Sequence, residues 1–152
     1  MSFELRVGRN AKSDAIQGLA YIFVKMLAVP QHGPEHLTIE YINSSRYFMF
    51  DLLDDFVDAM NHEEAIITLN TLSVQLIDFI LRLNGQWSGR GKTLSRGLNK
   101  LDTEMCKRFF MALDCFYKWN NKKQIIEFVN EVYKPIGGQL FAGFSMGKKS
   151  NL

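Results

Sequence analysis

The stretch HEEAIITLNTLSVQLIDFILRLN, residues 62–84, carries the longest helical pattern in the chain. Its apolar side chains recur every three or four residues, which is the spacing of a buried stripe on an α-helix. The stripe consists of Ile66, Leu69, Leu72, Leu76, Phe79, Ile80 and Leu83. The sequence His62-Glu63-Glu64 is typical of a helix start, and Asn84-Gly85 is typical of a left-handed helix end. We therefore predict a core helix over about 62–84.

The residues before this stretch predict two further helices. The first is capped by Ser13 or Asp14 and ended by Pro30. The β-prone segment Leu37–Ile42 follows, and it is either a lone strand or the lead-in to the next helix. That next helix begins at Ser44 or Ser45. Its apolar side is expected to contain Phe48, Leu52, Leu53, Phe56, Val57 and Met60.

The residues after the core helix predict three more helices. A turn over 86–92 leads to a short helix, Thr93–Leu101, and the next helix is capped by Asp102 or Thr103. The pair Asn120-Asn121 ends that helix, and a last one runs over 122–133 before Pro135 and Gly137-Gly138. Short turns between long helices indicate an all-α fold, an antiparallel four-helix bundle with one or two additional short helices. We expect a single domain over 1–152, frayed at 147–152.

The composition is that of an ordinary globular domain. Of 152 residues, 47% are hydrophobic and 22% are charged, which excludes a disordered or fibrous chain. The net charge of +2 is too small for a dedicated nucleic-acid binder, and no apolar run reaches the roughly 20 residues that span a bilayer. We therefore expect neither nucleic acid nor membrane as a partner. Without a CxxC pair or a secretory signal pattern, the expected location is the cytoplasm.

Residues 87–100 combine one aromatic ring with four cations, namely Trp87, Arg90, Lys92, Arg96 and Lys100. Arg96 and Lys100 share a helix face, and Lys92 precedes that face by one turn. Such cations can hold a phosphate or another anion through charge-assisted hydrogen bonds, aided by the helix start near Thr93. The segment predicts a ligand site, and the alternative is a solvated rim. Asp102 is expected to neutralise part of its charge.

The run Gly89-Arg90-Gly91-Lys92-Thr93 is similar to part of a nucleotide phosphate loop, but its spacing is wrong. Such a loop requires another glycine five residues before its last one, and Gln86 stands there. The loop must also follow a buried strand, whereas the segment before it has the pattern of a helix. We therefore interpret these glycines as a turn between two helices.

A row of four aspartates lies opposite the apolar stripe of the helix expected after Ser44. The row consists of Asp51, Asp54, Asp55 and Asp58. Metal sites in helical bundles draw ligands from facing helices, so we interpret this row as a solvated acidic face that can dock a basic partner. His32 and His36 are four apart, but Gly33 and Pro34 prevent the helix that would align them. We predict no metal, no cofactor and no catalytic residue.

The stretch LIDFILRLNGQWSGRGKTLSRGLNKLD, residues 76–102, resembles the helix-turn-helix in the carboxy-terminal helical domains of bacterial nucleotidyltransferases of the DNA polymerase β superfamily. In those domains a helix ends in Leu-Asn, a turn carries an aromatic residue and a glycine-containing spacer, and a lysine with a following arginine opens the next helix. The matching positions here are Leu83-Asn84, Trp87, Lys92 and Arg96, and Gly137-Gly138 is similar to the glycine pair after the last helix. The resemblance implies a helical bundle that binds substrate beside a catalytic domain.

The catalytic parts of that family are missing from this chain. Their mixed α/β domain carries a Gly-Ser loop and two metal-binding aspartates in Asp-x-Asp spacing, and the sequence contains neither motif. Our first hypothesis is therefore a non-catalytic bundle that binds a small anionic or polar ligand, or a separate catalytic nucleotidyltransferase chain, near Trp87. The second is an antitoxin-like or immunity-like adaptor that uses the acidic face at 51–58 or forms a homodimer.

Overall fold

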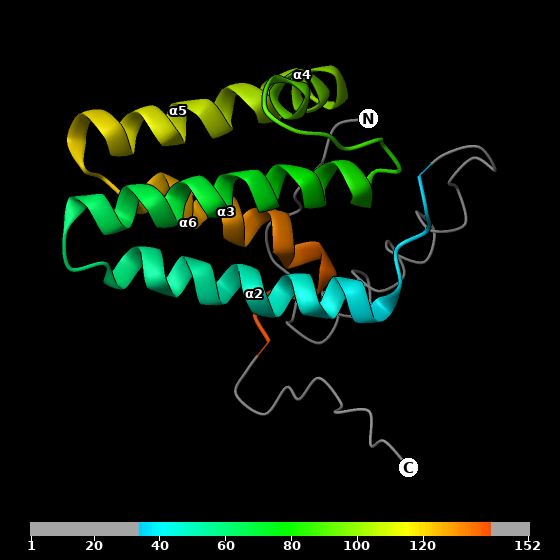
Figure 1. Cartoon of the computed structure of the whole chain (residues 1–152), viewed down its shortest axis with the longest axis horizontal. Helices are drawn as coiled ribbons and strands as arrows, with labels where there is room; N and C mark the ends of the chain where they lie inside the picture. The colour runs from blue at the N-terminus through cyan, green and yellow to red at the C-terminus, as the bar shows by residue number, and fades with distance from the viewer. Residues whose placement is uncertain (1–33, 141–152) are drawn as a thin grey trace, which may run out of the picture.

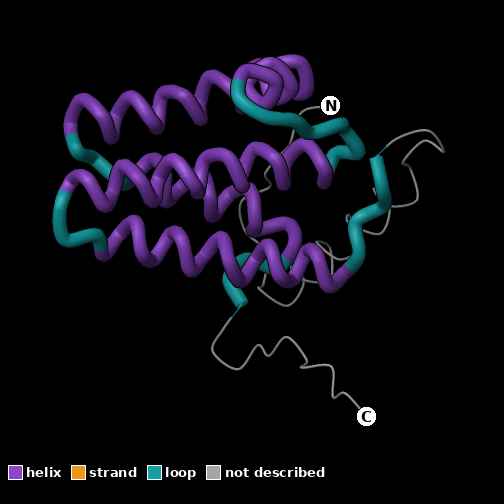
Figure 2. The backbone as a smooth tube through the Cα atoms, viewed as in Figure 1, coloured by secondary structure: helices purple, strands orange, loops and turns teal. Residues whose placement is uncertain are grey.

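A computed structural model describes residues 34–140, and within that range every regular element is helical. The elements are α2 (Ile39–Asp58), α3 (His62–Leu83), α4 (Lys92–Leu101), α5 (Thr103–Trp119), α6 (Lys123–Tyr133) and the 3-10 helix η1 (Lys134–Ile136). Figure 1 shows α3 running between α2 and α5 with α6 crossing obliquely behind it, and Figure 2 shows the loops that join the helices.

The predicted all-α class is confirmed for these residues. The arrangement as a four-helix bundle and the single domain over 1–152 stay predictions, because the helix expected to start at Ser13 or Asp14 lies outside the described residues. His32 and the frayed end predicted at 147–152 also lie outside the described residues.

α2 begins earlier than the sequence pattern predicted. It starts at Ile39, and the prediction of Ser44 or Ser45 was wrong. The Thr38 hydroxyl accepts a hydrogen bond from Tyr41 N at 3.1 Å, which satisfies one of the amide groups left open at a helix start. Residues 37–42 were predicted to be either a lone strand or the lead-in to a helix. The structure has the lead-in to a helix. β-branched residues oppose a helix only weakly, and burial of Ile42 outweighs that preference.

α3 has nearly the predicted bounds because both of its ends are capped. At its start the Asn61 side chain accepts a hydrogen bond from Glu64 N at 2.9 Å. The Glu64 carboxylate in turn accepts one from Met60 N at 3.2 Å. The first bond satisfies an amide group that the first turn of a helix leaves without a partner, and the second joins the residue before the cap to the same turn.

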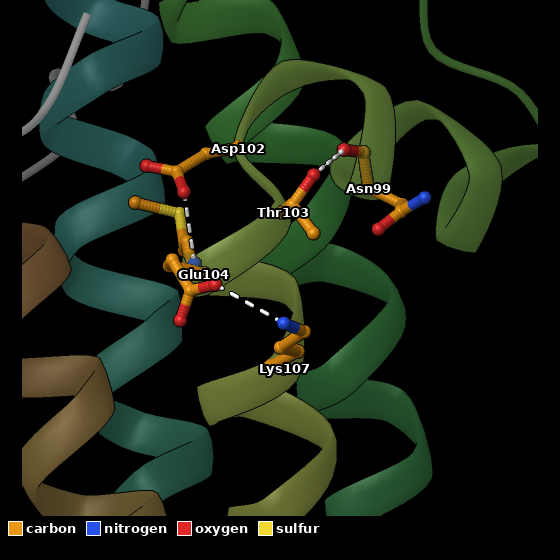
Figure 3. A network of polar contacts seen from close by, with 6 residues as sticks. Asn99, Asp102, Thr103, Glu104 and Lys107 are labelled. Carbon is orange, nitrogen blue, oxygen red and sulfur yellow. Dashed lines mark hydrogen bonds and ion pairs between the residues drawn. The ribbon is translucent and has the colours of Figure 1, made fainter.

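α4 and α5 meet at a sharp corner, which Figure 3 shows from close by. Asp102 is the residue that caps α5, since its Oδ1 accepts a hydrogen bond from Met105 N at 2.9 Å. The Thr103 hydroxyl donates back to the carbonyl of Asn99 at 3.1 Å. The chain thus leaves one helix and enters the next with almost no connecting loop.

α3 lies at the centre of the hydrophobic core. The leucines with no exposed surface at its centre are Leu69, Leu72 and Leu76. Phe56 of α2 packs edge-on against Phe116 of α5, with ring centroids 5.1 Å apart. Tyr133 at the end of α6 stacks on Phe79 of α3, with centroids 4.9 Å apart and ring planes 8° apart. One continuous cluster of buried side chains therefore joins these four helices.

Among the helices described, α3 alone is long and apolar enough to cross a membrane by length and composition. Its buried leucines account for that composition, because they pack inside the domain. The expectation that no membrane is involved stays a prediction.

Arg46 of α2 ties this helix to the turn that follows α6 and η1. Its Nε donates to the carbonyl of Gly138 at 2.8 Å, and its Nη2 donates to that of Gly137 at 2.9 Å. A Cβ at Gly137, whose φ is 105°, would lie 2.7 Å from the Arg46 Nη2. Glycine is favoured there by the positive φ, and a Cβ at this position would displace the end of the Arg46 side chain.

Candidate functional site

The turn between α3 and α4 begins with Gly85, just after the end of α3. Gln86 N donates to the carbonyl of Leu81 at 2.9 Å, and Gly85 N donates to that of Arg82 at 3.0 Å. With Gly85 at a φ of 66°, this is the Schellman pattern, so the predicted left-handed end of the helix is confirmed. The turn therefore leaves α3 in a defined direction, and Trp87 follows directly.

α4 packs closely on α3 through a small residue. Its buried side chains are Leu94 and Leu98. A Cβ at Gly97 would lie 3.1 Å from Leu81 Cδ1, so the absence of a side chain at Gly97 lets the two helices approach. This packing fixes which face of α4 turns inward, and hence which face is left to solvent.

Three of the predicted site residues share the outer face of α4. Lys92, Arg96 and Lys100 follow one another at intervals of four residues, opposite Leu94 and Leu98, and all three are exposed. Their side chains form no ion pair or hydrogen bond with any residue in the range 34–140. We call these three side chains the cationic face. Because no acid among the described residues forms an ion pair with it, the cationic face is available to an external anion.

The other two predicted residues lie on the turn before α4. Trp87 is 70% exposed, and Arg90 is also exposed. The carbonyl of Arg90 accepts a hydrogen bond from Thr93 N at 3.2 Å, which begins the first turn of the helix. The structure therefore places all five predicted side chains along one short segment, and all five are exposed.

Asp102 forms no ion pair with the cationic face. Its Oδ1 accepts the cap bond of α5, and no ion pair from Asp102 occurs in the described part of the chain. The nearby Glu104 is paired with Lys107 at 3.1 Å, as Figure 3 shows. The expectation that the charge of Asp102 neutralises part of the cationic face stays a prediction.

The four aspartates of α2 lie on its outer face, as predicted. Asp51, Asp54, Asp55 and Asp58 are all exposed, and none forms an ion pair with another residue between 34 and 140. We call them the acidic face.

Three of the apolar neighbours predicted for the buried side of α2 are exposed. Phe48 is 46% exposed, Val57 is 42% exposed, and Met60 is 90% exposed because the helix ends at Asp58. Helical spacing could not indicate that Met60 stands beyond the end of the helix.

A pocket between α3, α5 and α6 was not predicted. Its lining is Ile80, Leu83, Asn84, Met105, Arg108, Phe128, Glu131 and Val132. The Arg108 guanidinium lies 5.8 Å from the centre of the Phe128 ring and forms an ion pair with Glu131 at the pocket mouth. None of the five residues predicted for the ligand site lines it. Its lining comes from three separate helices, which sequence spacing does not bring together.

The described residues supply few groups for catalysis. They contain no cluster of three or more histidine, cysteine or acidic side chains that could hold a metal ion. Cys106 and Cys115 are both free thiols. Burial raises the pKa of the Cys106 thiol, which favours its protonated and weakly nucleophilic form. The chemistry available at the candidate site is therefore binding through charge and an aromatic ring.

Comparisons of this chain with models of protein families, with curated proteins and with solved structures found no match.

Proposed function

We propose that this chain is a non-catalytic helical binding domain, similar to the substrate-binding domains of nucleotidyltransferases. It binds a small anionic ligand, or an acidic surface of a separate catalytic chain, through Trp87, Arg90, Lys92, Arg96 and Lys100. The observation that carries the proposal is the cationic face of α4, whose three charges have no partner among the residues described.

The physical reason is that charges held on a rigid helix at fixed spacing are prepared for a multivalent anion. Successive residues of this face are four apart, which is about 6 Å along a helix. Each charge-assisted hydrogen bond to a phosphate or carboxylate is stronger than a neutral one. Trp87 adds an exposed aromatic ring, the kind of side chain that contributes most to binding at interfaces.

The proposal is tested by thermal unfolding with and without anions. We expect tripolyphosphate and nucleoside triphosphates to raise the melting temperature by several degrees, since a ligand that binds only the folded state stabilises it. Arg96→Ala should remove most of this shift. The matched control is Lys123→Ala, which removes a cation that is 76% exposed on α6 and should leave the shift unchanged. Equal shifts in both variants would exclude the cationic face as the anion site.

The adaptor function is kept as a second candidate because the acidic face also lacks partners among residues 34–140. It predicts that a basic protein co-purifies with the chain and is lost from the Asp54→Asn/Asp55→Asn variant. Recovery of the same protein with that variant would argue against a role for the acidic face.

A further inference from the structure

We propose that the acidic face of α2 in one copy of this chain binds the cationic face of α4 in a second copy. The inference rests on the proposed function, because it uses the same cations and names a second copy as their macromolecular partner. It is carried by the complementarity of the two faces, both of which are on the outside of the domain.

The two faces match in length. The acidic face extends from Asp51 to Asp58 and the cationic face from Lys92 to Lys100. At 1.5 Å per residue these spans are about 10 Å and 12 Å. On the cationic face the charges stand four residues apart. On the acidic face Asp51 and Asp55, and likewise Asp54 and Asp58, stand four apart, so the charges of each face form rows along one side of its helix. Two such rows can pair along their whole length.

The faces cannot pair within one molecule. α2 and α4 lie on opposite sides of α3, and Figure 1 shows them above and below it. Each helix turns its apolar side toward the interior, with Phe56 and Leu53 buried on α2 and Leu98 on α4. The two charged faces therefore point away from each other, and only another molecule can bring them together.

Exposed apolar side chains flank both faces and indicate the direction of pairing. Met60 follows Asp58 and is 90% exposed, whereas Trp87 precedes Lys92 and is 70% exposed. When the two helices run antiparallel, Asp58 lies opposite Lys92, and Met60 comes beside Trp87. A methionine sulfur next to an aromatic ring is a favourable contact, and antiparallel helices also align their dipoles favourably. We therefore assign the antiparallel register.

The association is expected to be weak and sensitive to salt. Exposed ion pairs each contribute little, and mobile ions screen them over about 10 Å at 0.1 M ionic strength. Charge complementarity then sets partner choice and register more than affinity. The acidic face of the first copy remains free after its α4 has bound, so the contact is head-to-tail and can add further copies.

The experiment is sedimentation of the full chain at protein concentrations up to about 1 mM, where weak contacts are populated. We expect the average mass to rise with concentration at roughly 0.02 M salt and to stay at that of a monomer at roughly 0.5 M salt. A monomer under both conditions would overturn the inference.

Two charge-reversed variants make the test specific. One carries Asp51→Lys, Asp55→Lys and Asp58→Lys, and the other carries Lys92→Glu, Arg96→Glu and Lys100→Glu. In each variant alone, two faces of like charge meet, and association should weaken by more than about tenfold. An equimolar mixture should associate again, because each variant then supplies the face that the other needs.

Circular dichroism is the check that both variants keep their helices, and recovery in the mixture would exclude unfolding as the cause of the loss. Persistent association of either variant alone, or no recovery in the mixture, would count against pairing of these faces. The aspartate variant retains the cationic face, so tripolyphosphate should still stabilise it. A wild-type chain that stays monomeric but still binds tripolyphosphate refutes only this inference, whereas a wild-type chain that does not bind the anion refutes the proposed function.

Discussion

Tyr133 is the largest side chain with no exposed surface, and it joins three helices. Its ring stacks on Phe79 and meets Phe50 edge-on, at 5.6 Å between centroids. Its hydroxyl is 2.7 Å from that of Ser45, so the one polar atom of the ring has a hydrogen-bond partner. Burial raises the pKa of this phenol, while the bond to Ser45 lowers it by a smaller amount. The residue is therefore neutral in the folded state at any ordinary pH.

This raised pKa predicts a loss of stability in alkali. Below a pH of about 10 the phenol is protonated in both the folded and the unfolded chain, so its contribution is fully present. Above that pH the unfolded chain releases the proton and the folded chain does not, which lowers the free energy of unfolding by up to about 1.4 kcal/mol per pH unit. Tyr133→Phe should make this decline shallower, although it costs about 1 kcal/mol near neutrality through the lost bond. Urea unfolding at several pH values measures both effects, and an unchanged slope would contradict the prediction.

The helix ends show where sequence patterns are informative. The starts of α3 and α5 were predicted closely from residues next to them. In the structure Asn61, which the prediction did not name, and Asp102, which it did, cap their own helices through bonds three residues away. The start of α2 was misjudged because Ile39 and Ile42 favour strands locally, and the burial of Ile42 against the core becomes visible only in the structure. A capping bond depends on residues only three apart in the sequence, whereas burial depends on packing partners far along the chain.

Removing the cap of α3 should therefore have a measurable effect. Asn61→Ala deletes the acceptor for Glu64 N and is expected to lower the free energy of unfolding by about 1 kcal/mol. Asn61→Asp keeps an acceptor at the same position and should stay within a few tenths of a kcal/mol of the wild-type value. Denaturant midpoints of the two variants, compared with wild type, give the result. Equal losses in both would show that the cap bond contributes nothing.

The candidate site was predictable in part. Regular spacing placed Lys92, Arg96 and Lys100 on one face, because a helix repeats every 3.6 residues. Their lack of ion-pair partners was not predictable. It depends on the start of α5, where Asp102 accepts a cap bond and Glu104 pairs with Lys107. The pocket between α3, α5 and α6 and the contacts of Arg46 were missed for a related reason. They join residues that are distant in the chain, and a single sequence carries no signal for such pairs.

The position of α3 at the centre of the domain leads to a prediction about its two sides. Leu72 has no exposed surface, whereas Ile67 on the same helix is 67% exposed. Leu72→Ala should lower the free energy of unfolding by about 3 kcal/mol, through lost burial and the cavity left behind. Ile67→Ala should change it by no more than about 0.5 kcal/mol. Comparable losses in thermal or urea unfolding would mean that α3 is not oriented as the structure shows.

The bonds from Arg46 to Gly137 and Gly138 have a consequence for synthesis on the ribosome. The donor is made 92 residues before the acceptor carbonyl of Gly138. At about 5–20 residues per second, roughly 5–20 seconds pass between the two. During that time α2 and α3 can pair as a local hairpin. Tyr133 and the glycine carbonyls that accept the hydrogen bonds of Arg46 have not yet been synthesised. Until the last helix is made, part of the core of the nascent chain therefore stays exposed to solvent. A chaperone that covers apolar surface would protect the chain most during this interval.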